Sequence, residues 1–304
     1  MLYKEFVRGI EIYNEKEWAV ISKFIRSTEK ESVKVWQRSM EFTRGAQGYP
    51  ADMQKIEALE IGMPLDTFDL GYGFTLEAIQ DSTADELKET QAEALRADQR
   101  LLMKIFCSKC LVPGASGASR GFWDSFQTKA PPPYRGNTFA ANHDHYNVSG
   151  AATVQLADLT SLKKHIREHG YMGDLYLFIN SGTVKAFEDL AGWTTAMSAT
   201  SIIETVATLG LRAVTKFNEF IIVIEDWVPD GYLFGVEGQI LPVTMREPVN
   251  PQATGLKLYR GPHDEYPLVE AYYRRRCGME VVHRGAGAVT QITAGSWVDP
   301  TFTF

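Results

Sequence analysis

Five residues between positions 143 and 169 have side chains that can bind a transition metal. His143 and His145 form an H-x-H pair, and two strand residues separated by one position face the same way. The segment from His165 to His169 matches H-x-x-E-H, in which two histidines hold zinc and the glutamate assists hydrolysis. One functional hypothesis is therefore a zinc-dependent hydrolase that uses His143, His145, His165, Glu168 and His169.

Three features of the sequence argue against that hydrolase. The H-x-x-E-H segment falls in the last turn of a predicted helix ended by Gly170, where basic side chains complement the helix dipole. No clearly marked downstream helix supplies a third carboxylate ligand. Arg167 also stands between the would-be ligands. A cupin-like metal site is weaker still, because the glutamate expected a few residues after H-x-H is replaced by Asn147, Val148 and Ser149. We therefore assign no catalytic, cofactor-binding or metal-binding residue from the sequence, and no cofactor.

Cys107 and Cys110 form a C-x-x-C pair, and Cys277 is the third cysteine. A structural zinc site would need a second pair, and a thioredoxin-like pair would open a helix, whereas this pair closes one. We expect two thiols at a helix end, at least one of them packed.

The dense basic cluster of the chain is Arg274, Arg275 and Arg276. On a strand these side chains alternate between the two faces, so neither face becomes strongly basic. Salt bridges between subunits and contacts with phosphate are both open for this cluster. The sequence patterns of phosphate-binding loops, dinucleotide-binding turns and serine-hydrolase elbows are missing.

Composition excludes several classes of protein. The 304 residues are 44% hydrophobic and 23% charged, which suits one large or two ordinary soluble domains. A net charge of −7 argues against a general basic surface for nucleic acid. The longest apolar runs, such as 220–224, fall short of the ~20 residues that cross a bilayer. The first residues lack the apolar core of a secretory signal, and the odd cysteine count gives no disulfide framework, so we expect synthesis in a reducing cytoplasm.

A long helical pattern precedes the histidines. Apolar residues recur at helical spacing between Leu76 and Phe106, which predicts a helix from about Thr75 to Cys110. Thr83 and Glu86 match a capping box, so we expect this helix to pause near Asp81 and restart. From position 84 to 107 alone it would extend about 36 Å at ~1.5 Å per residue. Such a helix must lie against something long, which favours an extended or assembled protein.

The flanking segments give an α+β class. Residues 14–17 are predicted to cap a helix whose Trp18, Ile21 and Ile25 share a face. Residues 33–65 read as two extended arms around a turn at 43–50, with little core of their own. Helices are predicted over 159–169 and around Val184 to Leu190. Strands are predicted over 175–179, 220–224, 232–236, 269–273, 279–283 and 289–292.

The order of these segments resembles the major capsid proteins of tailed bacteriophages, which share the Hong Kong 97-like fold with encapsulins. LGYGFTLEAIQD (70–81) resembles the entry to the family's spine helix, and LYLFINSGTVKAFEDL (175–190) an A-domain strand, turn and helix. FAANHDHYNVSGAA (139–152) is similar to an H-x-H-Y-x-x-S-G stretch of some phage capsid proteins, which gives the histidine pair a non-catalytic setting. DGYLFGVEG (230–238) and YPLVEAYYRRRCGMEVVHRGAGAVTQI (266–292) resemble the closing capsid strands.

The resemblance covers most of the chain from about Val33 onward and implies a division into parts. These are an N-terminal arm or helix (1–32), an E-loop hairpin (33–70), a P-domain with the spine helix (71–155), mainly A-domain (156–265) and returning P-domain and A-domain strands (266–304).

The implied function is structural and not enzymatic. As a major capsid protein the chain would self-assemble, as pentamers and hexamers, into an icosahedral shell around phage double-stranded DNA. The DNA would be contacted non-specifically at most, and no membrane is implied. Scaffolding, portal and decoration proteins are implied as further partners, and the virion as the location after synthesis in the cytoplasm of a host bacterium. An encapsulin-type compartment is the alternative with the same fold, and the zinc hydrolase is the alternative of a different class.

Overall fold

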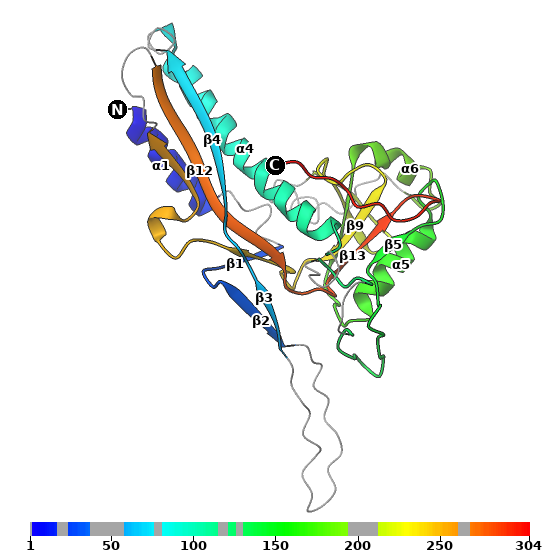
Figure 1. Ribbon diagram of the computed structural model, residues 1–304. Helices are drawn as coiled ribbons and strands as arrows, with labels where there is room; N and C mark the ends of the chain where they lie inside the picture. The colour runs from blue at the N-terminus through cyan, green and yellow to red at the C-terminus, as the bar shows by residue number, and fades with distance from the viewer. Residues whose placement is uncertain are drawn as a thin grey trace, which may run out of the picture.

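The computed structural model describes residues 2–16, 24–36, 58–75, 81–114, 121–125, 130–193, 212–260 and 268–304. They form an elongated body that contains β4, β12 and α4, a rounded body that contains β5, β9, β13 and α5, and a projecting hairpin of β2 and β3 (Figure 1). None of the helices in these ranges combines the length and apolar character needed to cross a membrane.

The elongated body is built around β12 (Leu268–Val281). Its residues 268–277 pair antiparallel with the whole of β4 (Asp66–Thr75), forming the long ribbon of Figure 1. It also pairs antiparallel with β10 (Val243–Arg246) and β11 (Leu256–Arg260), and β1 (Ile25–Thr28) adds to β10 in parallel. The strands predicted separately at 269–273 and 279–283 are therefore one continuous strand, because the arginines between them fit on alternate faces.

The long helix is α4 (Ala84–Leu111), whose 28 residues extend about 42 Å at ~1.5 Å per residue. Thr83 is its N-cap: Thr83 Oγ1 accepts from the Glu86 backbone at 3.3 Å, and Glu86 Oε2 accepts from the Thr83 backbone at 2.7 Å. The predicted restart after Asp81 is confirmed. The predicted start at Thr75 is wrong, since Thr75 ends β4, and residues 76–80 lie outside the described part of the chain.

The N-terminal helix α1 (Leu2–Lys16) was not predicted from the sequence. Asn14 does not begin a helix but sits in the last turn of this one, where its side-chain amide bonds the backbone of Leu256 in both directions, at 3.0 and 2.9 Å. Ile25 belongs to β1, and residues 17–23, which include Trp18 and Ile21, lie outside the described residues. Asn14 thus satisfies the backbone of β11 at the start of that strand.

The rounded body contains a six-stranded sheet in the order β5-β13-β9-β6-β8-β7. Its strands are β5 (Tyr146–Val148), β6 (Leu175–Ile179), β7 (Arg212–Phe217), β8 (Phe220–Ile224), β9 (Tyr232–Glu237) and β13 (Gly287–Gln291). The helices are α5 (Leu156–Arg167) and α6 (Val184–Glu188), with α6 shorter than predicted because a 3₁₀ turn, Ser181–Thr183, precedes it. The other predicted strands of this body are confirmed.

Every residue of β6 is buried because the sheet is covered on both faces. Leu175, Leu177 and Ile179 join the apolar cluster that includes α5 residues, whereas Tyr176 and Phe178 join the cluster of the α4 end. There Phe106 of α4 lies 6.2 Å from Phe178 and 5.7 Å from Phe234, ring centre to ring centre. The C-terminal half of α4 is therefore part of the core that joins the two bodies.

The three cysteines lie in this joining region. Cys107, Cys110 and Cys277 are all buried and free. Burial raises the pKa of each thiol. The expectation of packed thiols at a helix end is confirmed, and raised pKa values suit inert thiols better than redox-active ones.

The predicted pair of extended arms is confirmed as β2 (Ser32–Trp36) and β3 (Ala58–Gly62), which pair antiparallel. They form a separate two-stranded sheet. Arg246 anchors the base of this hairpin by donating to the Met63 carbonyl at 2.9 Å and pairing with Glu31 at 2.8 Å. The turn expected at 43–50 lies outside the described residues, and the expected E-loop boundary at position 70 falls inside β4.

A buried ion pair fixes β12 on α4. Arg275 donates from Nε and Nη2 to the two carboxylate oxygens of Asp98, at 2.6 and 2.5 Å, and the two side chains are only 4% and 2% exposed. Tyr13 of α1 donates to the same carboxylate at 2.7 Å. On the other face of β12, Arg274 makes a more exposed pair with Asp69 of β4. These arginines therefore make salt bridges within the subunit.

Asp98→Ala should lower the free energy of unfolding by about 3–5 kcal/mol, because it leaves a buried guanidinium and a tyrosine hydroxyl without their acceptor. The matched control is Asp69→Ala, which removes the exposed partner of the neighbouring arginine and should cost less than about 1 kcal/mol. Chemical unfolding followed by circular dichroism measures both. Equal losses in the two variants would contradict this assignment.

Candidate functional site

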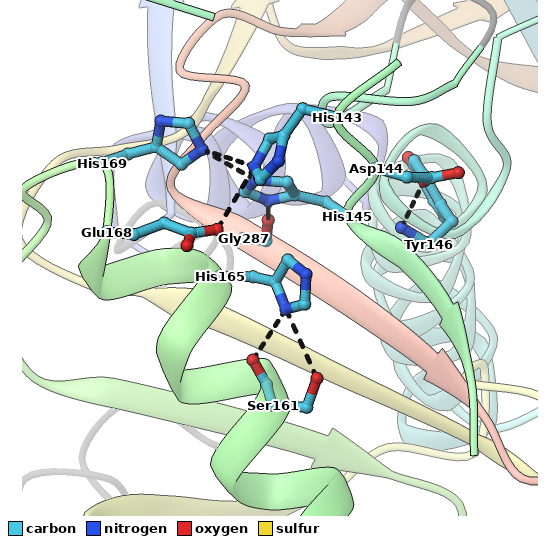
Figure 2. Close-up of polar contacts among 9 residues, drawn as sticks. All are labelled: His143, Asp144, His145, Tyr146, Ser161, His165, Glu168, His169 and Gly287. Atoms are coloured by element: carbon cyan, nitrogen blue, oxygen red, sulfur yellow. Dashed lines mark hydrogen bonds and ion pairs between the residues drawn. The ribbon is translucent and has the colours of Figure 1, made fainter. Parts of the chain in front are cut away.

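Four of the five predicted metal-binding side chains meet in the rounded body (Figure 2). His143 and His145 lie on the segment that enters β5, and Glu168 and His169 lie just beyond the end of α5. The atoms that could bind a metal in His143, His145, Glu168 and His169 all lie within 4.8 Å of one another. We call these four residues the histidine cluster.

Backbone pairing places the first two histidines. The His145 backbone donates to the Trp123 carbonyl at 2.8 Å and accepts from Val289 of β13 at 2.8 Å, which holds His145 fully buried at the sheet edge. Asp144 points the other way and accepts from the Tyr146 backbone at 2.7 Å (Figure 2). Alternation along an extended chain thus brings both imidazoles to one side, as predicted, although they precede the strand.

The end of α5 places the other two residues. The helix ends at Arg167, and Gly170 then adopts a φ of +89°, a left-handed conformation that glycine adopts without steric cost. Close packing accompanies this turn, since a Cβ on Gly285 would come within 2.9 Å of the His169 ring. The turn directs Glu168 and His169 toward β13 and the H-x-H segment.

The three imidazoles of the cluster converge through their Nε2 atoms. The Nε2–Nε2 distances are 3.2 Å between His143 and His145, 3.1 Å between His143 and His169, and 3.0 Å between His145 and His169. Each ring nitrogen offers either one N–H or one lone pair in the ring plane, so three nitrogens cannot all bond one another. Hydrogen bonds within the triangle therefore cannot satisfy all three Nε2 atoms at once.

Two further contacts define the electrostatics of the cluster. His145 Nδ1 lies 2.6 Å from the carbonyl oxygen of Gly287, so Nδ1 carries the proton and Nε2 presents its lone pair to the cluster. Glu168 Oε1 lies 3.3 Å from His143 Nε2 and is buried, and no residue that the structure describes gives it a hydrogen bond. One carboxylate oxygen therefore joins the three nitrogens.

Burial keeps these histidines neutral. It lowers the pKa of His143 to about 4 and that of His169 to about 3, with repulsion from neighbouring basic groups adding to the effect. The pKa of His145 is also lowered, by burial first and then by His169. Neutral imidazoles have free lone pairs at neutral pH, and such lone pairs bind metal ions.

His165 stands apart from the cluster. Its Nδ1 lies 2.8 Å from the carbonyl oxygen of Ser161, one helical turn earlier (Figure 2). The H-x-x-E-H motif would need His165 and His169 on one helical face, but the helix ends at Arg167, before the second histidine. The helix predicted to continue to 169 is therefore too long by two residues, and the predicted pairing of His165 with His169 does not form.

Sequence reasoning identified all four residues of the cluster but not their combination. The H-x-H and E-H segments are more than twenty positions apart, and Gly287 of β13, which orients His145, carries no sequence signal for that role. A signal was available in part, because Gly170 marks the end of the helix before His169.

Several solved structures have a similar fold over most of their length. A chain from Mycobacterium phage Patience matches with a TM-score of 0.74 and 25% identity, over 98% of this chain and 90% of that chain. A chain from the capsid of a native GTA particle matches with a TM-score of 0.56 and 15% identity, over 91% of each chain. A chain from an encapsulin complex of Synechococcus elongatus matches with a TM-score of 0.52 and 12% identity, over 94% of this chain and 91% of that chain. No protein-family model and no curated protein matches the sequence.

The chain therefore has the Hong Kong 97-like fold that phage capsid and encapsulin subunits share, and the α+β class predicted from the sequence is confirmed. The match extends through both bodies of Figure 1, since nearly the whole chain is covered.

Acid should destabilise the rounded body through the histidine cluster. The folded-state pKa values of about 4 and about 3 for His143 and His169 lie below the usual 6.5, so the unfolded chain binds more protons as pH falls. Their contribution to stability is complete above pH 6.5 and is lost as pH falls through the folded-state values. His165 and Lys164 repel added protons, and Glu168 is the acidic group that faces them.

Thermal unfolding in the presence of EDTA, from pH 7 to pH 4, measures this effect. The midpoint should fall by several degrees more in the wild type than in His143→Gln, which lacks one of the titrating groups. The variant His165→Gln keeps the triangle but removes one repelling group, so its midpoint should fall by an amount between those of the wild type and His143→Gln. Identical pH profiles for wild type and His143→Gln would contradict the prediction.

Proposed function

We propose that this chain is the major capsid protein of a tailed bacteriophage, a structural subunit that self-assembles into the icosahedral shell around double-stranded DNA. The observation that carries the proposal is the likeness to the Mycobacterium phage Patience chain over 98% of this chain, at 25% identity. The encapsulin likeness is weaker, at 12% identity, and by itself supports the fold alone.

The parts of the structure suggest which segments would serve which role. The elongated body of α1, α4, β1, β4 and β10 to β12 would be the P-domain, with α4 as the spine helix. The rounded body would be the A-domain. It includes β5, which the sequence placed in the P-domain segment 71–155, and β13, which the sequence placed among the returning strands 266–304. The hairpin of β2 and β3 would be the base of the E-loop.

The hairpin supports assembly because a two-stranded sheet is marginally stable by itself in water. β2 and β3 pair only with each other among the strands of the described ranges, and Figure 1 shows them projecting from the body. In a closed shell the same hairpin would lie over a neighbouring copy, a heterologous contact that repeats around each pentamer or hexamer. Many modest contacts of this kind then sum to a stable container.

The acidic composition fits a wall that holds DNA weakly. With a net charge of −7, the chain has few surplus cations to neutralise phosphates, and dense phosphate contacts would bind DNA strongly. DNA contact in this proposal is non-specific at most, and the role is structural and not enzymatic. The site of action is the virion, after synthesis in the host bacterium, with scaffolding, portal and decoration proteins as further partners.

The purified chain should form closed shells of megadalton mass. Negative-stain microscopy and light scattering measure size and shape, and nuclease-protected DNA inside particles from infected cells would separate a virus capsid from a compartment. A protein cargo in place of DNA would favour the encapsulin alternative. A stable monomer at high concentration would contradict the proposal.

Removing apolar contacts from the hairpin should reduce assembly without unfolding the subunit. Val33 and Ile61 are directly opposite each other, both half-buried, and Lys34 and Glu60 form the next, exposed pair on the other face. Val33→Ser with Ile61→Ser should lower the yield of closed shells several-fold, as measured by sedimentation. The control, Lys34→Ser with Glu60→Ser, should assemble like the wild type. Equal assembly of both variants would contradict an E-loop role for this face.

A further inference from the structure

The histidine cluster has no part in the assembly contacts described above. We propose that His143, His145, Glu168 and His169 bind one divalent transition metal ion, zinc in the first place, in a closed structural site within the rounded body. The spacing of the donor atoms, their orientation and the surroundings of the cluster support this assignment.

The spacing of the donors matches a tetrahedral ion. Zinc bonds to histidine nitrogen are about 2.0–2.1 Å long, so two ligands of a regular tetrahedron lie about 3.3–3.4 Å apart. The three Nε2–Nε2 distances are 3.2, 3.1 and 3.0 Å, and Glu168 Oε1 lies 3.3 Å from His143 Nε2. The three nitrogens would have to move apart by a few tenths of an ångström to admit an ion at the centre. Glu168 would also have to move closer to the other two imidazoles, because the donor atoms of the four residues lie up to 4.8 Å apart.

The orientation of the donors also favours an ion. The Gly287 carbonyl holds the Nδ1 proton of His145, which is how metal-binding histidines are commonly fixed by a neighbouring acceptor. The lone pairs directed into the triangle cannot satisfy one another, whereas one cation accepts all of them. Glu168 Oε1, buried without a hydrogen bond from the described residues, supplies the negative charge that such a cation needs.

The surroundings exclude water from one side. The ring of Phe139 stacks on His169 with ring centres 4.3 Å apart and lies 4.8 Å from the ring of His143. An apolar cover of this kind strengthens the attraction between a cation and its ligands by lowering the local dielectric constant.

The donor set indicates the type of ion and its role. Three imidazoles and one carboxylate suit zinc and related divalent ions, whereas magnesium and calcium prefer oxygen ligands. Four protein ligands fill a tetrahedral shell and leave no position for a substrate, which is the pattern of a structural site. The ion would tie three segments together: the entry to β5, the end of α5 and, through Gly287, the start of β13.

The test measures the metal content of the full chain. The protein is purified in its assembled form, in buffers without chelators. Elemental analysis should find about one zinc per chain, the stoichiometry of one four-ligand site. His145→Gln and Glu168→Ala should reduce this to the level of the buffer. The matched control is His165→Gln, which removes a nearby histidine outside the cluster and should keep its zinc.

A second measurement uses the wild type alone, in case a variant does not fold. EDTA should lower the thermal midpoint and added Zn²⁺ should restore it, because a ligand that binds only the folded state stabilises it. Co²⁺ in place of Zn²⁺ should give the visible absorption of a tetrahedral site.

Three results would overturn the proposal. They are wild-type zinc at the level of the buffer, a midpoint indifferent to EDTA and Zn²⁺, and full zinc retention in Glu168→Ala, which would mean an open three-histidine site. Metal-free shells would overturn this inference and leave the capsid proposal intact.

Discussion

The buried pair of Asp98 and Arg275 is the interaction on which the elongated body depends. Two charges removed from water are tolerated only when their hydrogen bonds are complete, and here both carboxylate oxygens are engaged by one guanidinium, with Tyr13 as a further donor. This requirement allows one register of β12 on α4. The pairing of β12 with its neighbouring strands follows from that register, and α1 is joined to the same point.

The same helix connects this polar interaction to the apolar core. The first half of α4 lies along the β4 and β12 ribbon, and its last turns bury Phe106 and two cysteines under the sheet of the rounded body. A helix of this length gives the subunit an elongated shape, with surface on several sides for neighbouring copies. The isolated hairpin adds a part that lacks a core of its own, and both features suit a protein whose contacts are completed by assembly.

The histidine cluster poses a different physical problem within this fold. Three imidazoles, one buried and two half-buried, have Nε2 atoms within about 3.2 Å of one another. This is an unusual choice, because apolar side chains would fill the space without unsatisfied polar atoms. The chain also places a buried carboxylate oxygen beside them. A bound cation removes this conflict, and it would link the entry to β5 with the end of α5. A structural ion there is compatible with a shell subunit, since it requires no substrate access.

What the sequence by itself determined were the features encoded by neighbouring residues. These include the capping box at Thr83, the fully apolar strand at 175–179, the end of α5 near Gly170, the two arms around 33–65 and the order of segments that resembles a capsid protein. Local hydrogen bonds and hydrophobic periodicity act over a few positions and can be read directly. Only the tertiary structure decided which partners meet: Arg275 with Asp98, 177 positions away, Asn14 with Leu256, and His169 with His143 and His145 in place of His165. Each of these choices depends on register and burial across distant segments, which no local pattern contains.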